Sequence, residues 1–342
     1  MIKTLIVDDS ALARDIIRHF LEQDKDFSII GEAVDGEDAI KKIVSLNPDL
    51  VTLDIEMPKK TGLEVIEAVM KECSVPIVVV TSHDTAKTAY EATVRGALEF
   101  YSKTTFSSTL SPEKEKEIYE TLKRISGVKS KPSFTDSFTV SQPAEIQQPE
   151  KREIRAVVVA SSTGGPKALS CFVSNLPAAF PVPIIIVQHN SSGFDKSFSQ
   201  WLDTYTGLTV KLAEENEIPL PGIIYISQTD KHLELRPAEE NKFRFFYTDD
   251  PPENNQKPAA DVLFRTAAEC LEDSLVSIVF TGMGSDGALG TEKVRSLRGI
   301  TMAQDEESSL IYGMPKAAKD TGCVDIVLPL DRLAEELVKL II

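Results

Sequence analysis

Short apolar runs alternate with amphipathic stretches along most of this chain, and no other sequence feature constrains the fold as much. Stretches such as SALARDIIRHFLEQ and GLEVIEAVMKE carry apolar residues at helical spacing. They separate runs with the length of buried strands, namely TLIV (4–7), FSIIGEAV (27–34), LVTL (50–53), IVVV (77–80) and LEFY (98–101). Because alternating strands and helices form parallel sheets with helices on both faces, the sequence predicts an α/β fold.

A polar segment at residues 126–153 interrupts this pattern. It contains three prolines and no sustained periodicity, so it is predicted to be a linker. The alternation then resumes with the runs AVVVA, IIIV, IIYI and SIVF, while HLELRPAEENKFRFFYTDD (232–250) predicts a small antiparallel hairpin. Two α/β domains are therefore expected, at 1–125 and 154–342, in line with ~150 residues per domain.

The charge balance limits the partners of the chain. Its formal net charge is −16, from 53 acidic and 37 basic residues, so nucleic acid and anionic membranes would be repelled. We expect the start MIKTLIVDD to be neither a signal peptide nor a membrane span, and no later apolar run approaches ~18 residues. The four cysteines form no CxxC pair and are read as free thiols. We expect a cytoplasmic protein with protein or cationic partners and no membrane insertion.

Chemically active side chains follow the predicted strands of the first domain, and in open parallel sheets such groups meet at the carboxyl edge. A close cluster of carboxylates repels itself and favours a hard cation such as Mg²⁺. One carboxylate could attack phosphorus, while a hydroxyl and an ammonium hold the phosphate oxygens. Each acid alone is better explained as a solvated cap at a strand end, but all five positions together predict a phosphoryl site: Asp8, Asp9, Asp54, Thr81 and Lys103.

The same reading of strand ends applies to the second domain. VVVA leads into Ser161 and Ser162, IIIVQ into His189, and SIVFTGMGS into Asp286. A serine hydroxyl becomes a useful nucleophile when an imidazole takes its proton and a carboxylate orients that imidazole. A histidine at a strand end is often only a satisfied structural residue. The combination of three groups at one sheet edge favours a catalytic triad.

Glycine-rich turns accompany the serine and the aspartate. Gly164 and Gly165, followed by Pro166, allow a sharp turn from a strand into a helix N-terminus. The loop TGMGSDG (281–287) repeats this design, and a backbone N–H such as that of Met283 could bind an oxyanion. The competing interpretation is a phosphate cradle at SSTGGPK, but this segment lacks the spacing of a P-loop.

The motifs VDDS, LDIEMPKKTGLE, VVVTS and GALEFYSK resemble the receiver domain of two-component response regulators over residues 2 to 125. The resemblance implies a flavodoxin-like (βα)5 fold, with Asp54 as phospho-acceptor and Mg²⁺ as cofactor. The implied metal contacts are Asp8, Asp9, Asp54 and the backbone carbonyl of Glu56, and the implied switch residues are Thr81, Phe100 and Lys103. Thr104 follows the lysine where the family usually has proline, so a cis X-Pro turn is not expected.

The motifs SSTGGPKAL, VQHNSSGFDKSFSQWL, PAADVLFRTAA, TGMGSDGALG and AQDEESSLIYGMPKAA resemble the catalytic domain of chemotaxis receptor methylesterases from residue 154 to 342. The resemblance implies a doubly wound parallel sheet and hydrolysis of γ-glutamyl methyl esters on chemoreceptors, with deamidation of receptor glutamines. It makes Ser162 the nucleophile, completed by His189 and Asp286, with no cofactor for hydrolysis. The backbone N–H groups of Thr163 and Met283 are the expected oxyanion donors.

Several expectations and departures accompany this resemblance. A chemotaxis histidine kinase is the expected phospho-donor, the chain is expected to be monomeric, and the unphosphorylated receiver is expected to obstruct access to Ser162. Departures at Ala160-Ser161, at Asn190-Ser191 and at SQTDK (227–231) bear on the substrate groove rather than on the triad. The alternatives are a phospho-switched adaptor, a DNA-binding regulator, which the acidity disfavours, and an esterase of a small metabolite.

Overall fold

The computed structural model describes residues 1–73, 75–82, 86–107, 110–128, 153–239 and 242–342. The chain divides into two compact units, Met1–Ser141 and Gln142–Ile342. Most of the predicted linker, 126–153, lies outside the described residues, so its boundaries stay a prediction. Among the described residues, no helix combines the length and apolarity needed to cross a bilayer.

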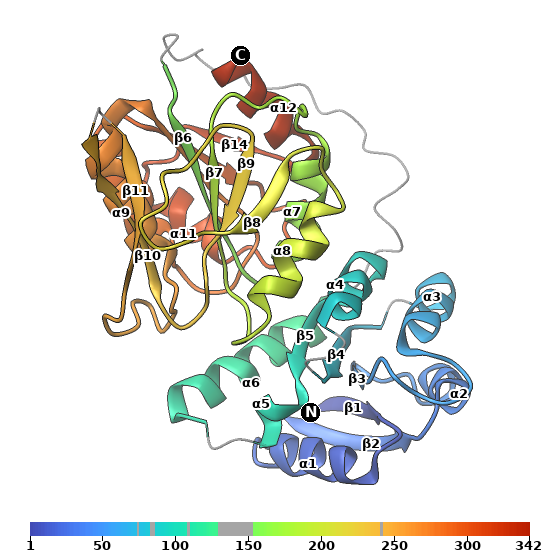
Figure 1. Ribbon diagram of the computed structural model, residues 1–342. Coiled ribbons are helices and arrows are strands. Elements are labelled where there is room, and N and C mark those ends of the chain that lie inside the picture. The colour runs from blue at the N-terminus through green and yellow to red at the C-terminus, as the bar shows by residue number, and fades with distance from the viewer. Residues whose placement is uncertain (74, 83–85, 108–109, 129–152, 240–241) are drawn as a thin grey trace. The chain divides into compact units, whose positions relative to one another are not determined.

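The first unit is built on a five-stranded parallel sheet with the order β2-β1-β3-β4-β5, the flavodoxin-like arrangement (Figure 1). The predicted fold of this unit is thus confirmed. The order reverses between β1 and β3, so the carboxyl ends of these two strands flank the topological switch point. The strands are β1 (Ile2–Val7), β2 (Phe27–Ala33), β3 (Leu50–Leu53), β4 (Ile77–Thr81) and β5 (Glu99–Ser102).

Helices cover both faces of this sheet, and side-chain caps fix where several of them begin. Ser10 caps α1, Ser111 caps α6, and Thr61 forms a capping box with Glu64 at α3. On one face Tyr119 of α6 stacks on Phe20 of α1, with ring centroids 4.7 Å apart. The helices are α1 (Ala11–Glu22), α2 (Gly36–Leu46), α3 (Gly62–Glu72), α4 (Ala86–Arg95), α5 (Lys103–Ser107) and α6 (Pro112–Ser126).

The second unit contains a seven-stranded parallel sheet with the order β14-β13-β12-β6-β7-β9-β8, and a separate hairpin of β10 and β11. The predicted doubly wound sheet and the predicted hairpin are both confirmed. The chain enters at central β6, builds outward through β7, and then crosses to β12. The strands are β6 (Ala156–Ser161), β7 (Ile184–Gln188), β8 (Thr209–Leu212), β9 (Ile223–Ile226), β10 (His232–Pro237), β11 (Phe243–Thr248), β12 (Leu275–Val279), β13 (Ile300–Gln304) and β14 (Ile326–Leu328).

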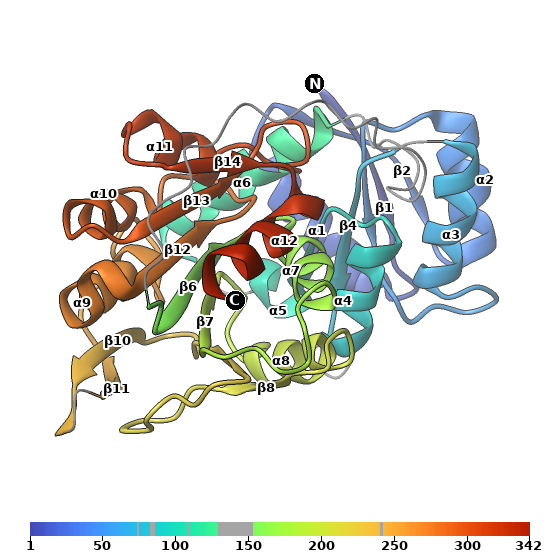
Figure 2. The same cartoon turned by 90° about the horizontal axis from the view of Figure 1, so that it is seen from above.

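Helices cover both faces of the second sheet as well, with α9, α10 and α11 on one side and α7, α8 and α12 on the other (Figure 2). The central strands β6, β7 and β12 are completely buried between these layers, as their continuous apolar runs require. The helices are α7 (Gly165–Ser174), α8 (Asp195–Asp203), α9 (Ala260–Leu271), α10 (Ala288–Ser296), α11 (Met314–Asp320) and α12 (Leu330–Ile341).

Candidate functional site

The predicted triad residues of the second unit lie at the carboxyl ends of three adjacent strands. Ser162 follows β6, His189 follows β7, and Asp286 lies in the loop after β12; β6 pairs with both of the other strands. The backbone N–H of His189 donates to the carbonyl of Ser161 at 3.0 Å, which extends the pairing of β6 and β7 to the site. The sheet therefore brings the serine to the middle position, at the switch point between β6 and β12.

The imidazole and the carboxylate meet across the end of β6. Nε2 of His189 lies 2.8 Å from Oδ2 of Asp286, and the two side chains are 8% and 1% exposed. The other ring nitrogen, Nδ1, is buried and has no hydrogen-bond partner among the described residues. A neutral imidazole that donates from Nε2 has its lone pair on Nδ1, so Nδ1 is the atom that can accept a proton.

Asp286 is held as an anion by its surroundings. Backbone N–H groups of Ala260, Asp261 and Gly287 donate to its carboxylate at 2.7, 3.0 and 3.1 Å. Burial by itself would raise the pKa of Asp286, but the hydrogen bond from His189 and these N–H groups outweigh burial and keep the pKa below its ordinary value. The carboxylate can therefore orient the imidazole and stabilise its protonated form.

The two neighbouring serines have different environments. Ser161 is completely buried, and its hydroxyl donates to Oε1 of Gln188 at 2.7 Å. Ser162 is half-buried, and its hydroxyl has no hydrogen-bond partner within the described ranges. Its backbone is fixed from the β12 side, because its N–H donates to the carbonyl of Thr281 at 3.1 Å. Of the two hydroxyls, Ser162 has the one available for chemistry.

Glycines allow the surrounding turns to approach Ser162 closely. Gly164 has φ of +79° at the N-cap of α7, a backbone conformation that L side chains rarely adopt. A Cβ on Gly282 would lie 2.8 Å from Cβ of Ser162, so this loop packs directly against the serine. Thr163 and Met283 belong to these two turns. Their role as oxyanion donors stays a prediction.

Asp261 and Asn254 also belong to this site, and neither has a role in the sequence-based prediction. Asp261, in the first turn of α9, is completely buried and accepts hydrogen bonds from the N–H of Gly290 at 2.6 Å and from Nδ2 of Asn254 at 2.7 Å. Nδ2 of Asn254 also lies 3.4 Å from Oδ1 of Asp286. Burial and the charge of Asp286 raise the pKa of Asp261 to about 6. The available signal was an acid placed among apolar residues in PAADVLF.

This raised pKa predicts a pH-dependent stability. The folded chain binds the Asp261 proton more tightly than the unfolded chain, so this stabilisation is complete below about pH 4 and is lost as pH rises through about 6. Relative to Asp261→Asn, the wild type should lose about 2–3 kcal/mol of unfolding free energy between pH 4 and 8. Urea unfolding, followed by the fluorescence of buried Trp201 in α8, measures this difference. Identical pH profiles for the two proteins would contradict the assignment.

The predicted phosphoryl site lies at the carboxyl edge of the first sheet. Carboxylate oxygens of Asp8, Asp9 and Asp54 lie within 4.8 Å of one another. Nζ of Lys103 lies 2.7 Å from Oδ2 of both Asp8 and Asp54. Asp8 and Asp54 are buried, whereas Asp9 is exposed. The strands therefore bring together the acids and the ammonium that the sequence placed at this edge.

The electrostatics of this cluster suit a divalent cation. Burial raises the pKa of Asp54, and nearby Asp8 adds to the rise, while the hydrogen bond from Lys103 opposes it. Burial disfavours the charged form of Lys103, but its two ion pairs outweigh burial and raise its pKa. Three carboxylates offer only hard oxygen donors, so the residues present fit Mg²⁺.

The remaining predicted receiver residues have clear positions. Thr81 is buried at the end of β4, paired in register with Ser102, which precedes Lys103. Phe100 is buried in β5 and packs edge-on against Tyr90 of α4, with ring centroids 4.8 Å apart. The exposed side chain of Glu56 lies two residues after Asp54. Their roles in switching and in metal binding stay predictions.

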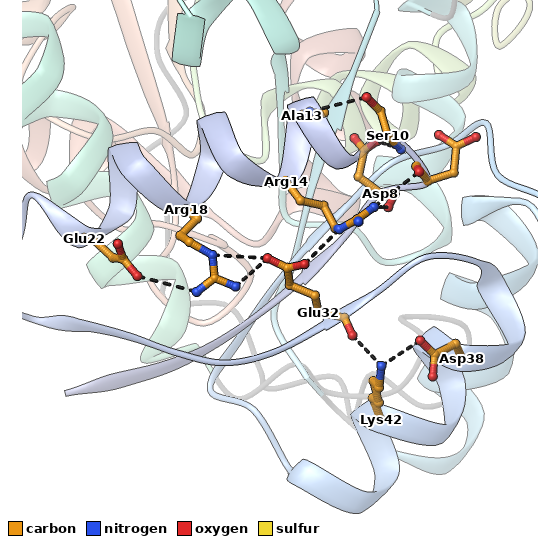
Figure 3. Close-up of polar contacts among 10 residues, drawn as sticks. Asp8, Ser10, Ala13, Arg14, Arg18, Glu22, Glu32, Asp38 and Lys42 are labelled. Carbon is orange, nitrogen blue, oxygen red and sulfur yellow. Dashed lines mark hydrogen bonds and ion pairs between the residues drawn. The ribbon is translucent and has the colours of Figure 1, made fainter.

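An arginine absent from the sequence-based prediction braces the acidic turn. Nη1 of Arg14 donates to the backbone carbonyls of Asp8 and Asp9 at 2.8 and 3.2 Å (Figure 3). Nε of the same arginine donates to Glu32 at 2.9 Å, and Arg18 binds the other oxygen of Glu32. Glu32 of β2 thus holds the guanidinium of Arg14 in place, and the guanidinium in turn holds the turn that carries Asp8 and Asp9.

Arg14→Gln should weaken Mg²⁺ binding about 10-fold because the acidic turn loses its brace. Removal of a positive charge beside a cation site would by itself strengthen binding, so the two effects have opposite signs. Isothermal titration of the full chain with Mg²⁺ measures the change. Arg18→Gln is the matched control, since Arg18 shares Glu32 but does not contact the turn. Equal or tighter binding by Arg14→Gln would refute the bracing role.

Comparisons with known proteins found matches for both units of the chain. Residues 157–337 match the family model described as CheB methylesterase, and residues 4–111 match the response regulator receiver domain. A relative from Thermotoga maritima, named protein-glutamate methylesterase/protein-glutamine glutaminase, is 36% identical over 349 residues, covering 100% of this chain and 99% of the relative. A relative of the same name from Halalkalibacterium halodurans is 36% identical over 341 residues, covering 99% and 98%.

A solved structure supports the fold of the second unit. The crystal structure of the Thermotoga maritima CheB methylesterase catalytic domain is 41% identical, with a TM-score of 0.54, and the match covers 55% of this chain and 98% of that one. The receiver model matches the first unit and the methylesterase model the second, and the Thermotoga maritima relative matches the whole chain. This chain therefore belongs to the CheB methylesterase family, with a response regulator receiver domain preceding the esterase domain.

Proposed function

We propose that this chain removes methyl esters from glutamate side chains of methyl-accepting chemotaxis receptors, under the control of phosphorylation at Asp54. The observation that carries this proposal is the hydrogen bond between His189 and Asp286, which spans the end of the strand that bears Ser162. The names of the full-length relatives support the same activity.

In the proposed reaction, Oγ of Ser162 attacks the ester carbonyl carbon while Nδ1 of His189 takes the hydroxyl proton. Asp286 stabilises the imidazolium through Nε2. The N–H groups of Thr163 and Met283 bind the developing oxyanion. The carbon–oxygen bond to the methoxy group then breaks, and His189 returns the proton so that methanol leaves. Water, deprotonated by His189, hydrolyses the acyl-enzyme to the glutamate carboxylate and regenerates Ser162.

In the receiver, a carboxylate oxygen of Asp54 attacks the phosphorus of the phosphohistidine of a kinase. The new O–P bond forms as the P–N bond breaks, and the kinase imidazole leaves and takes up a proton. Asp8, Asp9, Asp54 and the carbonyl of Glu56 would hold Mg²⁺, which neutralises charge on the transferred phosphoryl group when bound. Lys103 and Thr81 hold phosphate oxygens. The buried side chain of Phe100, which packs against Tyr90, then changes its rotamer when Asp54 is phosphorylated.

The regulatory part of the proposal concerns access to the serine. We infer domains at 1–125 and 154–342 joined by a tether at 126–153, with the unphosphorylated receiver obstructing Ser162. We place the protein in the cytoplasm as a monomer. Glutamine side chains of the receptors are the second substrate, since an amide carbonyl can be attacked in the same way and releases ammonia.

Methanol release identifies the substrate class. Methylated receptor membranes and a small methyl ester are compared at equal ester concentration, together with co-sedimentation of the chain with the receptors. We expect release mainly from the receptors. Preference for the small ester would indicate a metabolite esterase, and receptor binding without any methanol would indicate an adaptor.

A further inference from the structure

Gln188, the last residue of β7, contacts the backbone of both the proposed nucleophile and the proposed base. Its side chain is 3% exposed, and Nε2 donates to the carbonyl of Ser162 at 3.1 Å and to the carbonyl of His189 at 2.9 Å. A single amide group therefore links the two turns that set the distance between Ser162 and His189. Neither turn is stiff by composition, because Ser162 leads into Gly164 and Gly165, and His189 into two serines and a glycine.

The two carbonyls fix the direction of this amide, and the buried neighbour Ser161 holds its other end. The Ser161 hydroxyl donates to Oε1 of Gln188 at 2.7 Å, which leaves Nε2 to face the two carbonyls. If the amide were reversed, Oε1 would face two carbonyl oxygens, which can only accept. The carbonyls of Ser162 and His189 thus allow one orientation, and in that orientation the Ser161 hydroxyl satisfies Oε1.

The first residue of α7 leaves room for this arrangement. A Cβ on Gly165 would lie 2.0 Å from Oε1 of Gln188 and 3.0 Å from Cβ of Ser161. The N–H of Gly165 also donates to the carbonyl of Ser162 at 2.7 Å, so that carbonyl receives two hydrogen bonds. The contacts of Ser161, Gly165 and Gln188 converge on the turn that carries the serine.

We propose that Gln188, held at Oε1 by Ser161, is a positioning residue that keeps the Ser162 hydroxyl in reach of the His189 imidazole. This inference rests on the proposed hydrolase function. Gln188 contacts neither the substrate nor the reacting atoms in this role; it acts through the two backbones. Displacement of a reacting group by about 1 Å can cost about 100-fold in rate, so loss of the amide should be visible in catalysis.

The test is Gln188→Met, which keeps the side-chain length and removes all three hydrogen bonds. In the full chain, kcat for methanol release from receptor membranes should fall about 30- to 100-fold, with KM changed less than about twofold. Gln188→Glu should be at least as impaired, because a carboxylate would face two carbonyl oxygens. Gln200→Met, the same substitution at an exposed glutamine of α8 in the same unit, is the matched control and should keep kcat.

A purely structural role would lower the melting temperature of Gln188→Met and leave kcat per folded molecule within twofold of wild type, which would overturn the proposal. If this variant does not fold, Ser161→Ala decides, because Oε1 of Gln188 then loses its hydroxyl donor and the amide is held less firmly: kcat should fall about 3- to 10-fold, and an unchanged kcat would refute the role. Failure of the hydrolase function itself is distinguishable, because the wild type would then release no methanol, or Ser162→Ala would release it at the wild-type rate.

Discussion

Ser162→Ala is expected to lower methyl-ester hydrolysis by about 10³-fold or more, with the fold intact. The hydroxyl is half-buried and unengaged among the described residues, so its removal breaks no hydrogen bond that supports the structure. What is lost is the nucleophile, and binding together with oxyanion donors gives only residual catalysis. The rate of methanol release from methylated receptor membranes measures the effect.

Ser161→Ala provides the comparison for this experiment. The two serines are neighbours of the same type, but the hydroxyl of Ser161 is buried and bonded to Gln188. Its loss should cost several-fold in rate rather than a thousandfold. If Ser161→Ala lost more activity than Ser162→Ala, Ser162 would not be the nucleophile.

Asp286→Asn is expected to lower kcat by about 10²- to 10⁴-fold. The carboxylate accepts hydrogen bonds from His189 and from the backbone N–H groups of Ala260 and Asp261. An amide placed here must turn its NH₂ group toward one of these donors. The imidazole then loses its anionic partner, and its protonated form becomes harder to reach.

The stability of Asp286→Asn should fall as well, because donors in a buried site lose an acceptor. Thermal unfolding followed by Trp201 fluorescence separates this loss from the loss of kcat measured on folded protein. Asp273→Asn, at a partly exposed acid in the same unit, is the control and should change neither quantity measurably. A kcat within threefold of wild type for Asp286→Asn would contradict its orienting role.

Much of the site could be predicted from the sequence because parallel sheets collect strand ends at one edge. The residues that follow the apolar runs lie at the carboxyl edge of the sheet of their own unit: Asp54 in the first, and Ser162 and His189 in the second. This placement requires only strand positions and the parallel order. It does not require knowledge of side-chain packing, which is why a short local pattern was enough.

The parts that could not be predicted depend on packing between distant segments. The strands β8, β13 and β14 were not recognised as apolar runs, because TVKL, ITMAQ and IVL are short or contain polar residues. Likewise, nothing local in the sequence indicates that Arg14 reaches the carbonyls of Asp8 and Asp9, or that Gln188 bonds to Ser162. These contacts exist only when the folded elements meet.

The most direct test of the whole account is methanol release from methylated receptor membranes by the full chain, with and without phosphorylation of Asp54. The account predicts release that increases several-fold on phosphorylation in the wild type, no such increase in Asp54→Asn, and almost no release from Ser162→Ala under either condition. Equal rates for the wild type and Ser162→Ala would contradict the hydrolase mechanism. Equal rates with and without the phosphoryl group would contradict its control by the receiver.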